Sequence, residues 1–216
     1  MGFLYLTKKA GQPTLPRNDG PRGDSVAEQL LARHPEQAAI DWPEGFAAGV
    51  VHRLDHWTSG LVIAATSLKS LSEARARFES HTLRKQYRFL TDRSVPWESG
   101  AVKHELAHDR KDRRKMVWRR GRSTPHRGKW YPAHTELRRL RAGCPSLWEA
   151  VITTGVMHQV RLHAASAGLA LLGDRLYGGT SVSEGRYFLH HGRIDGWPGA
   201  PTVPLPGDWP SDKGEA

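Results

Sequence analysis

VHRLDHWTSG, residues 51–60, is the stretch on which the fold and the chemistry of this chain depend. The apolar residues before Asp55 predict a strand over 47–55, HWTSG (56–60) predicts a turn, and LVIAAT (61–66) predicts a second strand. Asp55 is thus expected where a strand ends, close to Arg53 and His56. A carboxylate in that position suits an ordinary surface turn, and it equally suits an active site that needs a carboxylate kept charged beside cations.

Outward from this stretch, helices and strands alternate along the chain. Ser25 and Glu28 form a capping-box pattern that predicts a helix within 24–35. Further helices are predicted over 67–81 and over 157–168, the second ending at Gly168. Further strands are predicted at residues 3–6, 85–92, 114–120, 133–140 and 146–154, with a loop at 121–129.

This order predicts an α+β fold with a mixed, largely antiparallel sheet that helices flank around a central active-site cleft. We expect one catalytic domain over residues 1–216, with an irregular proline- and glycine-rich end from about residue 192.

Composition narrows the class of protein. The single cysteine, Cys144, excludes an internal disulfide and a cysteine-based zinc finger. No apolar run approaches the roughly 20 residues of a membrane span, and the first residues lack the order of a signal peptide. We therefore expect a soluble, cytoplasmic, monomeric protein without a membrane partner.

The charge is localised. The chain has a formal net charge of +10, and the segment from Lys103 to Arg141 contains 14 basic and 4 acidic residues. Such an excess indicates a polyanionic partner, most often a nucleic acid, although a solvated basic face is the alternative. Phosphate contacts are expected from Arg113, Arg114 and Arg119.

Two short patterns suggest other chemistry. HELAH (104–108) matches the H-E-x-x-H pattern of zinc proteases, but the charged sequence DRKDRRK that follows does not suit a partly buried helix. A zinc metalloprotease is thus a remote alternative. GRSTPHRGKW (121–130) departs from the phosphate-loop pattern, because six residues separate its glycines and Trp130 replaces the Ser or Thr.

Several stretches taken together and in order resemble the RluA-type RNA pseudouridine synthases. They are LTKKAGQP (6–13), HRLDHWTSG (52–60), KQY (85–87), GVMHQVRLHAASAGLALLGDRLYGG (155–179) and FLHHGRID (188–195). Each piece is weak alone, whereas the ordered set is specific. The family isomerises uridine to pseudouridine in structured RNA, so the resemblance implies an enzyme without metal or cofactor that acts on ribosomal or transfer RNA.

The resemblance also implies roles for individual residues. Asp55 would be the catalytic carboxylate, Arg161 would keep it ionised, and Tyr87 would stack on the uracil and move the C5 proton. Arg53 would fill the gap left by a uridine extruded from the RNA. Further contacts to the substrate are expected from His52, His56, Thr58, His158 and Gln159.

This sequence departs from the family pattern at two places. Val156 replaces a usual Arg, and His56-Trp57 replaces a common Arg-Asp pair. These departures support an alternative in which the chain binds RNA without catalysis. We also expect that no RNA-binding module precedes this region, so that the protein holds RNA with its own surface.

Overall fold

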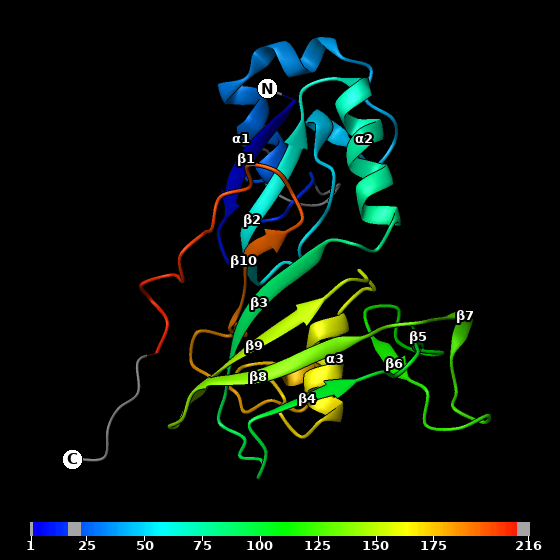
Figure 1. Cartoon of the computed structure of the whole chain (residues 1–216), viewed down its shortest axis with the longest axis vertical. Coiled ribbons are helices and arrows are strands. Elements are labelled where there is room, and N and C mark those ends of the chain that lie inside the picture. The colour runs from blue at the N-terminus through cyan, green and yellow to red at the C-terminus, as the bar shows by residue number, and fades with distance from the viewer. Residues whose placement is uncertain (1, 17–22, 211–216) are drawn as a thin grey trace. The chain divides into compact units, whose positions relative to one another are not determined.

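The computed structural model describes residues 2–16 and 23–210, which form two compact units. Among these residues, the first unit comprises 2–16, 23–83 and 190–206, and the second comprises 84–189 and 207–210. Figure 1 shows the elements of both units along the chain. A single catalytic domain over 1–216 stays a prediction.

The first unit is built on three neighbouring strands in the order β1-β2-β10. β1 pairs antiparallel with β2, so that Phe3 lies opposite Ala65 and Lys8 lies opposite Gly60. Its elements are β1 (Phe3–Lys8), α1 (Val26–Arg33), the 3₁₀ turns η1 (Pro35–Ala39) and η2 (Ala47–Gly49), β2 (Thr58–Ala65), α2 (Leu68–Glu79) and β10 (Leu189–Asp195).

Local capping explains both helices of this unit. The Ser25 hydroxyl accepts a hydrogen bond from the Glu28 N–H, and the Glu28 carboxylate accepts one from the Ser25 N–H. This capping box satisfies backbone donors that a helix start leaves unpaired, and it confirms the prediction for α1. Ser67 caps α2 in the same way with Ser70, which confirms the second helix.

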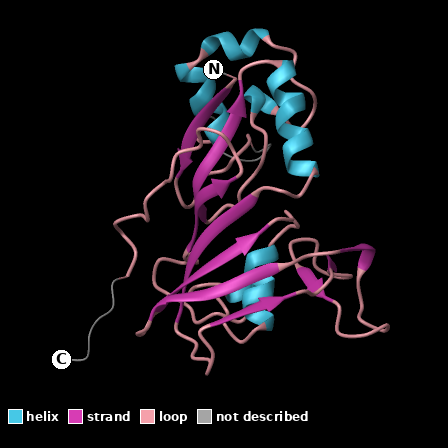
Figure 2. Cartoon of the chain, in the orientation of Figure 1, coloured by secondary structure: helices cyan, strands magenta, loops and turns pink. Residues whose placement is uncertain are grey.

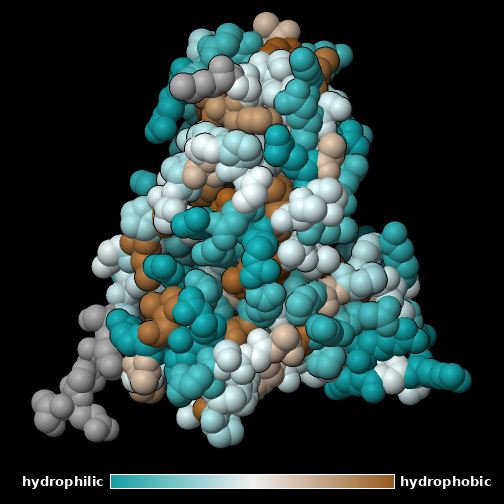
Figure 3. All heavy atoms as spheres, viewed as in Figure 1, coloured by the Kyte–Doolittle hydropathy of each residue, from teal (hydrophilic) through white to brown (hydrophobic). Residues whose placement is uncertain are grey.

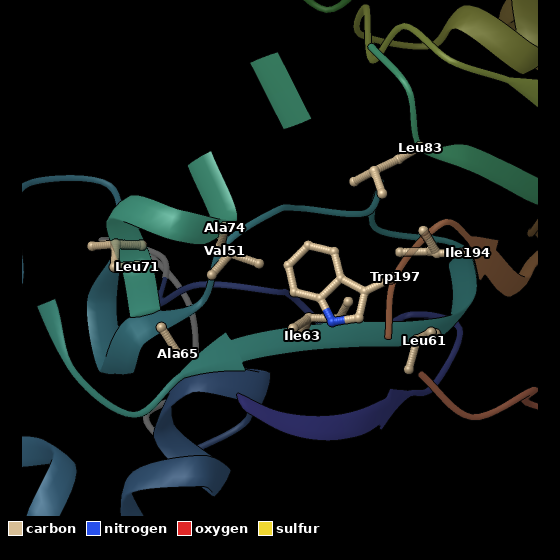
Figure 4. Packing of buried hydrophobic residues seen from close by; sticks show 9 residues of the cluster. All are labelled: Val51, Leu61, Ile63, Ala65, Leu71, Ala74, Leu83, Ile194 and Trp197. Atoms are coloured by element: carbon tan, nitrogen blue, oxygen red, sulfur yellow. The ribbon is translucent and has the colours of Figure 1, made fainter. Parts of the chain in front are cut away.

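In the core of the first unit, α2 and the segment around Ile194 and Trp197 pack against β2. Figure 4 shows the indole of Trp197 lying over β2 near Ile63. Every residue of β2 is buried, which explains its continuous run of small and apolar side chains. The buried cluster consists of Val51, Leu61, Ile63, Ala65, Leu71, Ala74, Leu83, Ile194 and Trp197.

The predicted strand over 47–55 is wrong. Residues 47–49 form the η2 turn, Val50 makes only an isolated bridge to Ala64, and residues 51–55 have no regular structure. The reason is backbone geometry, because Ala48 and Gly49 have φ values of 54° and 75° that interrupt an extended chain. The neighbouring strand begins earlier than predicted, at Thr58.

The second unit contains the sheet β3-β9-β8-β4, with each neighbouring pair antiparallel. Buried and half-buried residues alternate along β9, which confirms the strand predicted there. The elements are β3 (Arg84–Thr91), β4 (Ser99–Val102), β8 (Thr135–Arg141), β9 (Ser146–Ile152), α3 (Gln159–Ser166) and the 3₁₀ turn η3 (Arg175–Tyr177).

A second, smaller sheet in this unit has the strand order β6-β5-β7. Its strands are β5 (Leu106–His108), β6 (Met116–Trp118) and β7 (Arg127–Tyr131). β6 lies within the strand predicted at 114–120, whereas β7 begins inside the predicted loop 121–129. We call residues 106–131 the basic sheet.

These elements confirm the α+β class, as Figure 2 illustrates with its helices and strands. The end predicted to be irregular from residue 192 begins instead with the last residues of β10, and residues 196–210 form no helix or strand. Its last residues, 211–216, lie outside the described part. Within residues 2–16 and 23–210, no helix has the length and apolar character needed to cross a membrane.

Candidate active site

Asp55 lies in a tight turn that neighbouring side chains hold in place. The Thr58 N–H donates to the Asp55 carbonyl at 3.0 Å, which closes the turn over residues 55–58. Just before it, the Thr14 hydroxyl donates to the Leu54 carbonyl at 3.1 Å and accepts from the Leu54 N–H at 3.2 Å. The backbone on both sides of Asp55 is therefore fixed.

Lys8 is the buried cation of this turn. Its ammonium donates to the carbonyls of His56 at 2.8 Å, Thr58 at 2.6 Å and Lys9 at 3.1 Å. Burial lowers the pKa of Lys8 from 10.5 to about 7, and the negative charge of Asp55 opposes that shift. Lys8 thus binds the turn and attracts the carboxylate that the turn presents.

The residues Thr58-Ser59-Gly60 join this turn to β10. The Ser59 hydroxyl bonds His190 Nδ1 at 2.9 Å, and His190 Nε2 donates to the Val203 carbonyl. Gly60 has a φ of 124°, and a Cβ atom there would lie 2.1 Å from the His191 carbonyl oxygen. Only glycine fits so close to this carbonyl, which explains why the stretch HRLDHWTSG (52–60) ends in Gly60.

The other predicted contacts in the first unit differ in exposure. Arg53 and His56 are exposed, so they are available to a ligand, whereas Thr58 is buried at 2% exposure. His52 Nε2 accepts the Ile63 N–H at 3.2 Å, and its ring lies against Phe78 and His191. His52 therefore anchors the chain before Asp55, and its contact with RNA stays a prediction, as does that of Thr58.

Arg161 lies on α3 in the second unit, where Asp174 holds it in a buried fork. Its Nε donates to Asp174 Oδ2 at 2.7 Å and its Nη2 donates to Oδ1 at 2.8 Å. The guanidinium carbon lies 4.2 Å from the ring centre of Tyr187 and 5.1 Å from that of Tyr177. Two parallel hydrogen bonds and two aromatic rings leave this cation little freedom.

The loop that supplies Asp174 is wound tightly by glycine. A Cβ atom on Gly173 would lie 1.9 Å from the Arg186 carbonyl oxygen, and one on Gly179 would lie 1.9 Å from that of Leu171. The Gly179 N–H donates back to the Asp174 carbonyl at 2.8 Å. The GDRLYGG sequence (173–179) is thus the sequence of a loop that places a carboxylate under Arg161.

His158 lies just before α3 rather than inside the helix as predicted. It is the N-cap residue with a φ of 56°, a left-handed conformation that is uncommon for residues other than glycine. Its Nδ1 bonds the Tyr177 hydroxyl at 2.8 Å, and that hydroxyl accepts the Met116 N–H at 2.9 Å. Tyr177 therefore links His158, Arg161 and β6.

Gln159 is buried and uses its amide on protein groups. Its oxygen accepts from Thr154 and from the Val156 N–H, and its nitrogen donates to the His134 carbonyl and the Thr135 hydroxyl. This geometry makes Gln159 a positioning residue for the start of α3. It does not favour the contact with RNA that was predicted for it.

His163, also on α3, shares the Thr135 hydroxyl with Gln159 as a hydrogen-bond partner. It bonds the Thr135 hydroxyl and the His104 carbonyl, and burial lowers its pKa from 6.5 to about 4. The imidazole is therefore neutral near pH 7, and its Nε2 proton is donated to the carbonyl. These bonds tie α3 to β8 and to the chain leading into β5.

Tyr87 lies half-buried on β3, opposite Ala150 of β9. Two residues earlier on the same face, Lys85 is buried at 7% exposure, and burial lowers its pKa from 10.5 to about 8. Gly155 gives the lysine room, since a Cβ atom there would lie 3.3 Å from its Nζ. The KQY sequence therefore presents an aromatic hydroxyl and a buried amine on one face.

The three arginines expected to bind phosphate are not equivalent. Arg114 pairs with Asp112 at 3.1 Å and Arg119 pairs with Glu105 at 2.6 Å. Arg113 is exposed, and within the described residues no carboxylate pairs with it. Two of the predicted contacts thus have their charge already compensated.

The zinc-protease pattern has a different structure from the one its chemistry requires. Residues 106–108 form β5, whereas zinc binding by H-E-x-x-H needs both histidines on one helical turn. Glu105 is in an ion pair with Arg119. Across the described ranges, no group of three or more His, Cys, Asp or Glu side chains is arranged to hold a metal ion.

Sequence reasoning missed several residues of these arrangements, although the motifs contained them. Each belongs to a stretch quoted for the resemblance or to its immediate neighbourhood, but none of the patterns states which groups pair in space. The missed residues are Lys8, Lys85, Asp174, Tyr177 and Tyr187.

Comparisons with known proteins identify the family of this chain. A family model described as RNA pseudouridylate synthase matches residues 2–166. An uncharacterized RNA pseudouridine synthase of Chloroflexus aurantiacus is 33% identical over 212 residues, covering 93% of this chain and 62% of that protein. The ribosomal large subunit pseudouridine synthase D of Xylella fastidiosa is 32% identical over 178 residues, covering 82% of this chain and 49% of that protein.

A solved structure, human RNA pseudouridylate synthase domain containing 1, has the same fold with a TM-score of 0.69 and 24% identity. The alignment covers 89% of this chain and 74% of that one. The chain spans less than two thirds of the length of the two curated relatives described above. Because the family model covers most of the chain, and because Asp55, KQY and Arg161 lie within the match, the chain belongs to the RNA pseudouridylate synthase family.

Proposed function

We propose that this chain isomerises uridine to pseudouridine in RNA, with Asp55 as the catalytic carboxylate. In this reaction the bond from uracil N1 to ribose C1′ breaks and a bond from C5 to C1′ forms. C5 loses its proton and N1 gains one, so that atoms balance without a redox change, hydrolysis or an external energy source. The carboxylate acts at the ribose, either by attack at C1′ or by removal of a ribose proton.

The observation that carries the proposal is the position of Asp55 within the family motif. A carboxylate is a weak nucleophile unless it is held in place and kept ionised. Thr14 and Lys8 fix the backbone around Asp55, and the ammonium of Lys8 lies close enough to attract its charge. An ordinary surface turn has no need of a buried lysine with three carbonyl partners.

The remaining roles follow from the chemistry. Tyr87 provides an aromatic ring to stack on the uracil and a hydroxyl to move the C5 proton, and exposed Arg53 provides a planar cation for the gap that the extruded uridine leaves. Ribosomal RNA is the proposed substrate, since the Xylella relative is named for the large ribosomal subunit. Transfer RNA is the competing substrate.

Tritium release tests this function directly. Ribosomal RNA transcribed with C5-tritiated uridine should lose tritium to water when incubated with the full chain, because C5 exchanges its proton for the new bond. The same assay with transfer RNA shows which of the two RNAs is the substrate, since only the substrate releases tritium. Binding of both RNAs without release of tritium would support instead the alternative of a non-catalytic RNA-binding protein.

Tyr87→Phe separates the ring of this residue from its hydroxyl. The phenyl ring should still stack on the base, so affinity for RNA should stay within about threefold, because stacking requires only the aromatic face. The rate at saturating RNA should fall by about 10²-fold or more, the usual cost of losing a general acid or base. Filter binding and single-turnover tritium release measure the two quantities. A lower affinity with a normal saturated rate would assign the hydroxyl to recognition.

A further inference from the structure

Three cations of the basic sheet lie over aromatic rings. One of them, Arg119 at 5.7 Å from the ring centre of Trp130, is also paired with Glu105, and the other two are Arg120 and Lys129. The guanidinium carbon of Arg120 lies 5.1 Å from the ring centre of Trp118, and Lys129 Nζ lies 5.1 Å from that of Tyr131. Both cations are exposed, while both rings are half-buried. Figure 3 shows hydrophilic residues gathered over the region where β5 to β7 lie.

An aromatic ring and a carboxylate hold a cation with different consequences. A carboxylate cancels the charge, as Asp112 does for Arg114 and Glu105 does for Arg119. A ring attracts the cation through its quadrupole and leaves the net charge unchanged. Within the described residues, Arg120 and Lys129 have no carboxylate partner, so each keeps a full positive charge in a restrained position.

The strand register places both rings on one face. Leu106 of β5 lies opposite Trp118 of β6 and opposite Tyr131 of β7. Residues directly opposite one another share a face, and so do residues two apart on a strand. The pairing of β7 with β5 is irregular between Arg127 and Tyr131, so Lys129 is placed by its contact with the Tyr131 ring, while Arg120 lies over Trp118 from just beyond the end of β6.

This face is joined to the helix that contains Arg161. Leu106 and Met116 pack with Leu162 in one buried cluster, to which the half-buried Trp118 and Val156 add contacts. The Met116 N–H donates to Tyr177, whose ring lies against Arg161. An apolar residue at 156 completes this packing, which gives a structural reason for the departure from the family pattern.

We propose that Arg120 and Lys129 form a phosphate-binding surface on the basic sheet that docks the RNA backbone outside the reactive nucleotide. The inference rests on the proposed function, because it takes RNA as the substrate. Restrained cations lose less side-chain freedom when they bind phosphates, which favours affinity. The excess of positive charge in this segment, 14 basic against 4 acidic residues from Lys103 to Arg141, complements a polyphosphate rather than a single acidic group.

Two double variants with the same change in net charge test the proposal. One is Arg120→Gln with Lys129→Gln; the matched control is Arg114→Gln with Arg119→Gln. RNA affinity is measured against salt concentration in the full chain carrying Asp55→Asn, so that no turnover occurs. Losing two phosphate contacts should reduce the slope of log Kd against log salt by about 1.4 to 1.8. The control should change the slope by less than about 0.5.

Equal slope changes in the two variants would overturn the proposal, since net charge alone would then explain binding. Poly-glutamate serves as a second probe, in place of an acidic protein. If Arg120→Gln with Lys129→Gln leaves the salt slope for RNA unchanged but abolishes binding of poly-glutamate, the proposal is also overturned, and the surface is assigned to an acidic protein. Tyr131→Leu keeps every charge and removes one ring, so affinity should fall about threefold or more with the slope unchanged. Unchanged RNA affinity in Tyr131→Leu would show that the rings do not contribute to RNA binding.

The proposed function and this inference fail in different ways. Wild-type protein that releases no tritium, but whose salt slope depends on Arg120 and Lys129, would disprove the activity and keep the docking surface. If Arg120→Gln with Lys129→Gln has the same kcat/KM as the wild type at subsaturating RNA and the same salt slope, the docking surface is disproved and the activity stands.

Discussion

Asp55→Asn is expected to abolish detectable pseudouridine formation, a loss on the order of 10⁴-fold or more in rate. The amide has nearly the same size and shape as the carboxylate, but it has no charge with which to attack C1′ or to remove a ribose proton. The hydrogen bonds that hold the backbone of this turn come from Thr14, Lys8 and the turn itself, so the variant should still fold. Single-turnover tritium release and circular dichroism measure the two effects.

RNA affinity gives this variant a second, independent measurement. Asp55→Asn should bind RNA as well as the wild type or slightly more tightly, because a negative charge facing phosphates has been removed. Glu105→Gln is the control, since Glu105 belongs to the HELAH pattern and pairs with Arg119 on the surface. The proposal is disproved by near wild-type turnover in Asp55→Asn together with an inactive Glu105→Gln.

Elements governed by local rules were predictable from the sequence. The capping box of Ser25 and Glu28 fixed the start of α1, and the alternation along 146–152 identified β9. The strand predicted at 47–55 failed because a tertiary contact decides that region. A Cβ atom on Gly49 would lie 2.3 Å from the Ala65 carbonyl oxygen, a close approach that no local pattern reveals.

Short strands with charged residues were the other failure. β7 has the sequence RGKWY, whose arginine, glycine and lysine are not typical of a strand. It forms because β5 supplies the partner, so that Leu106 lies opposite Tyr131. Pairing between distant segments therefore overrides a weak intrinsic preference, and the sequence alone could not locate the second sheet.

In the candidate site too, local motifs identify single residues, whereas their partners are brought together only by the fold. The motifs identified Asp55, Tyr87 and Arg161 as residues to consider, and all three lie within the matched family region. The partners were not predictable, because Asp174 lies 13 residues after Arg161 and Lys8 lies 48 residues before His56, whose carbonyl it binds. Which side chains meet depends on the loop that Gly173 and Gly179 allow, and only the folded chain shows that loop.

Arg161→Met is expected to inactivate the protein and to destabilise it. Removing the guanidinium leaves Asp174 buried at 1% exposure without its fork, and breaking a buried ion pair typically costs about 3–5 kcal/mol of unfolding free energy. Activity should fall by about 10²-fold or more, the usual effect of removing one preorganised electrostatic contact. Urea unfolding and tritium release per folded molecule measure the two losses separately.

A second substitution distinguishes a catalytic role of Arg161 from a structural one. Arg161→Met combined with Asp174→Leu removes both buried charges, so stability should recover by about 3 kcal/mol or more relative to Arg161→Met, because replacing a whole buried pair is often neutral. Turnover should not recover, since no cation remains on α3. Arg161→Lys should also stay impaired, because an ammonium cannot form the two parallel bonds to Asp174. Recovery of turnover along with stability in the double variant would show that Arg161 only supports the fold.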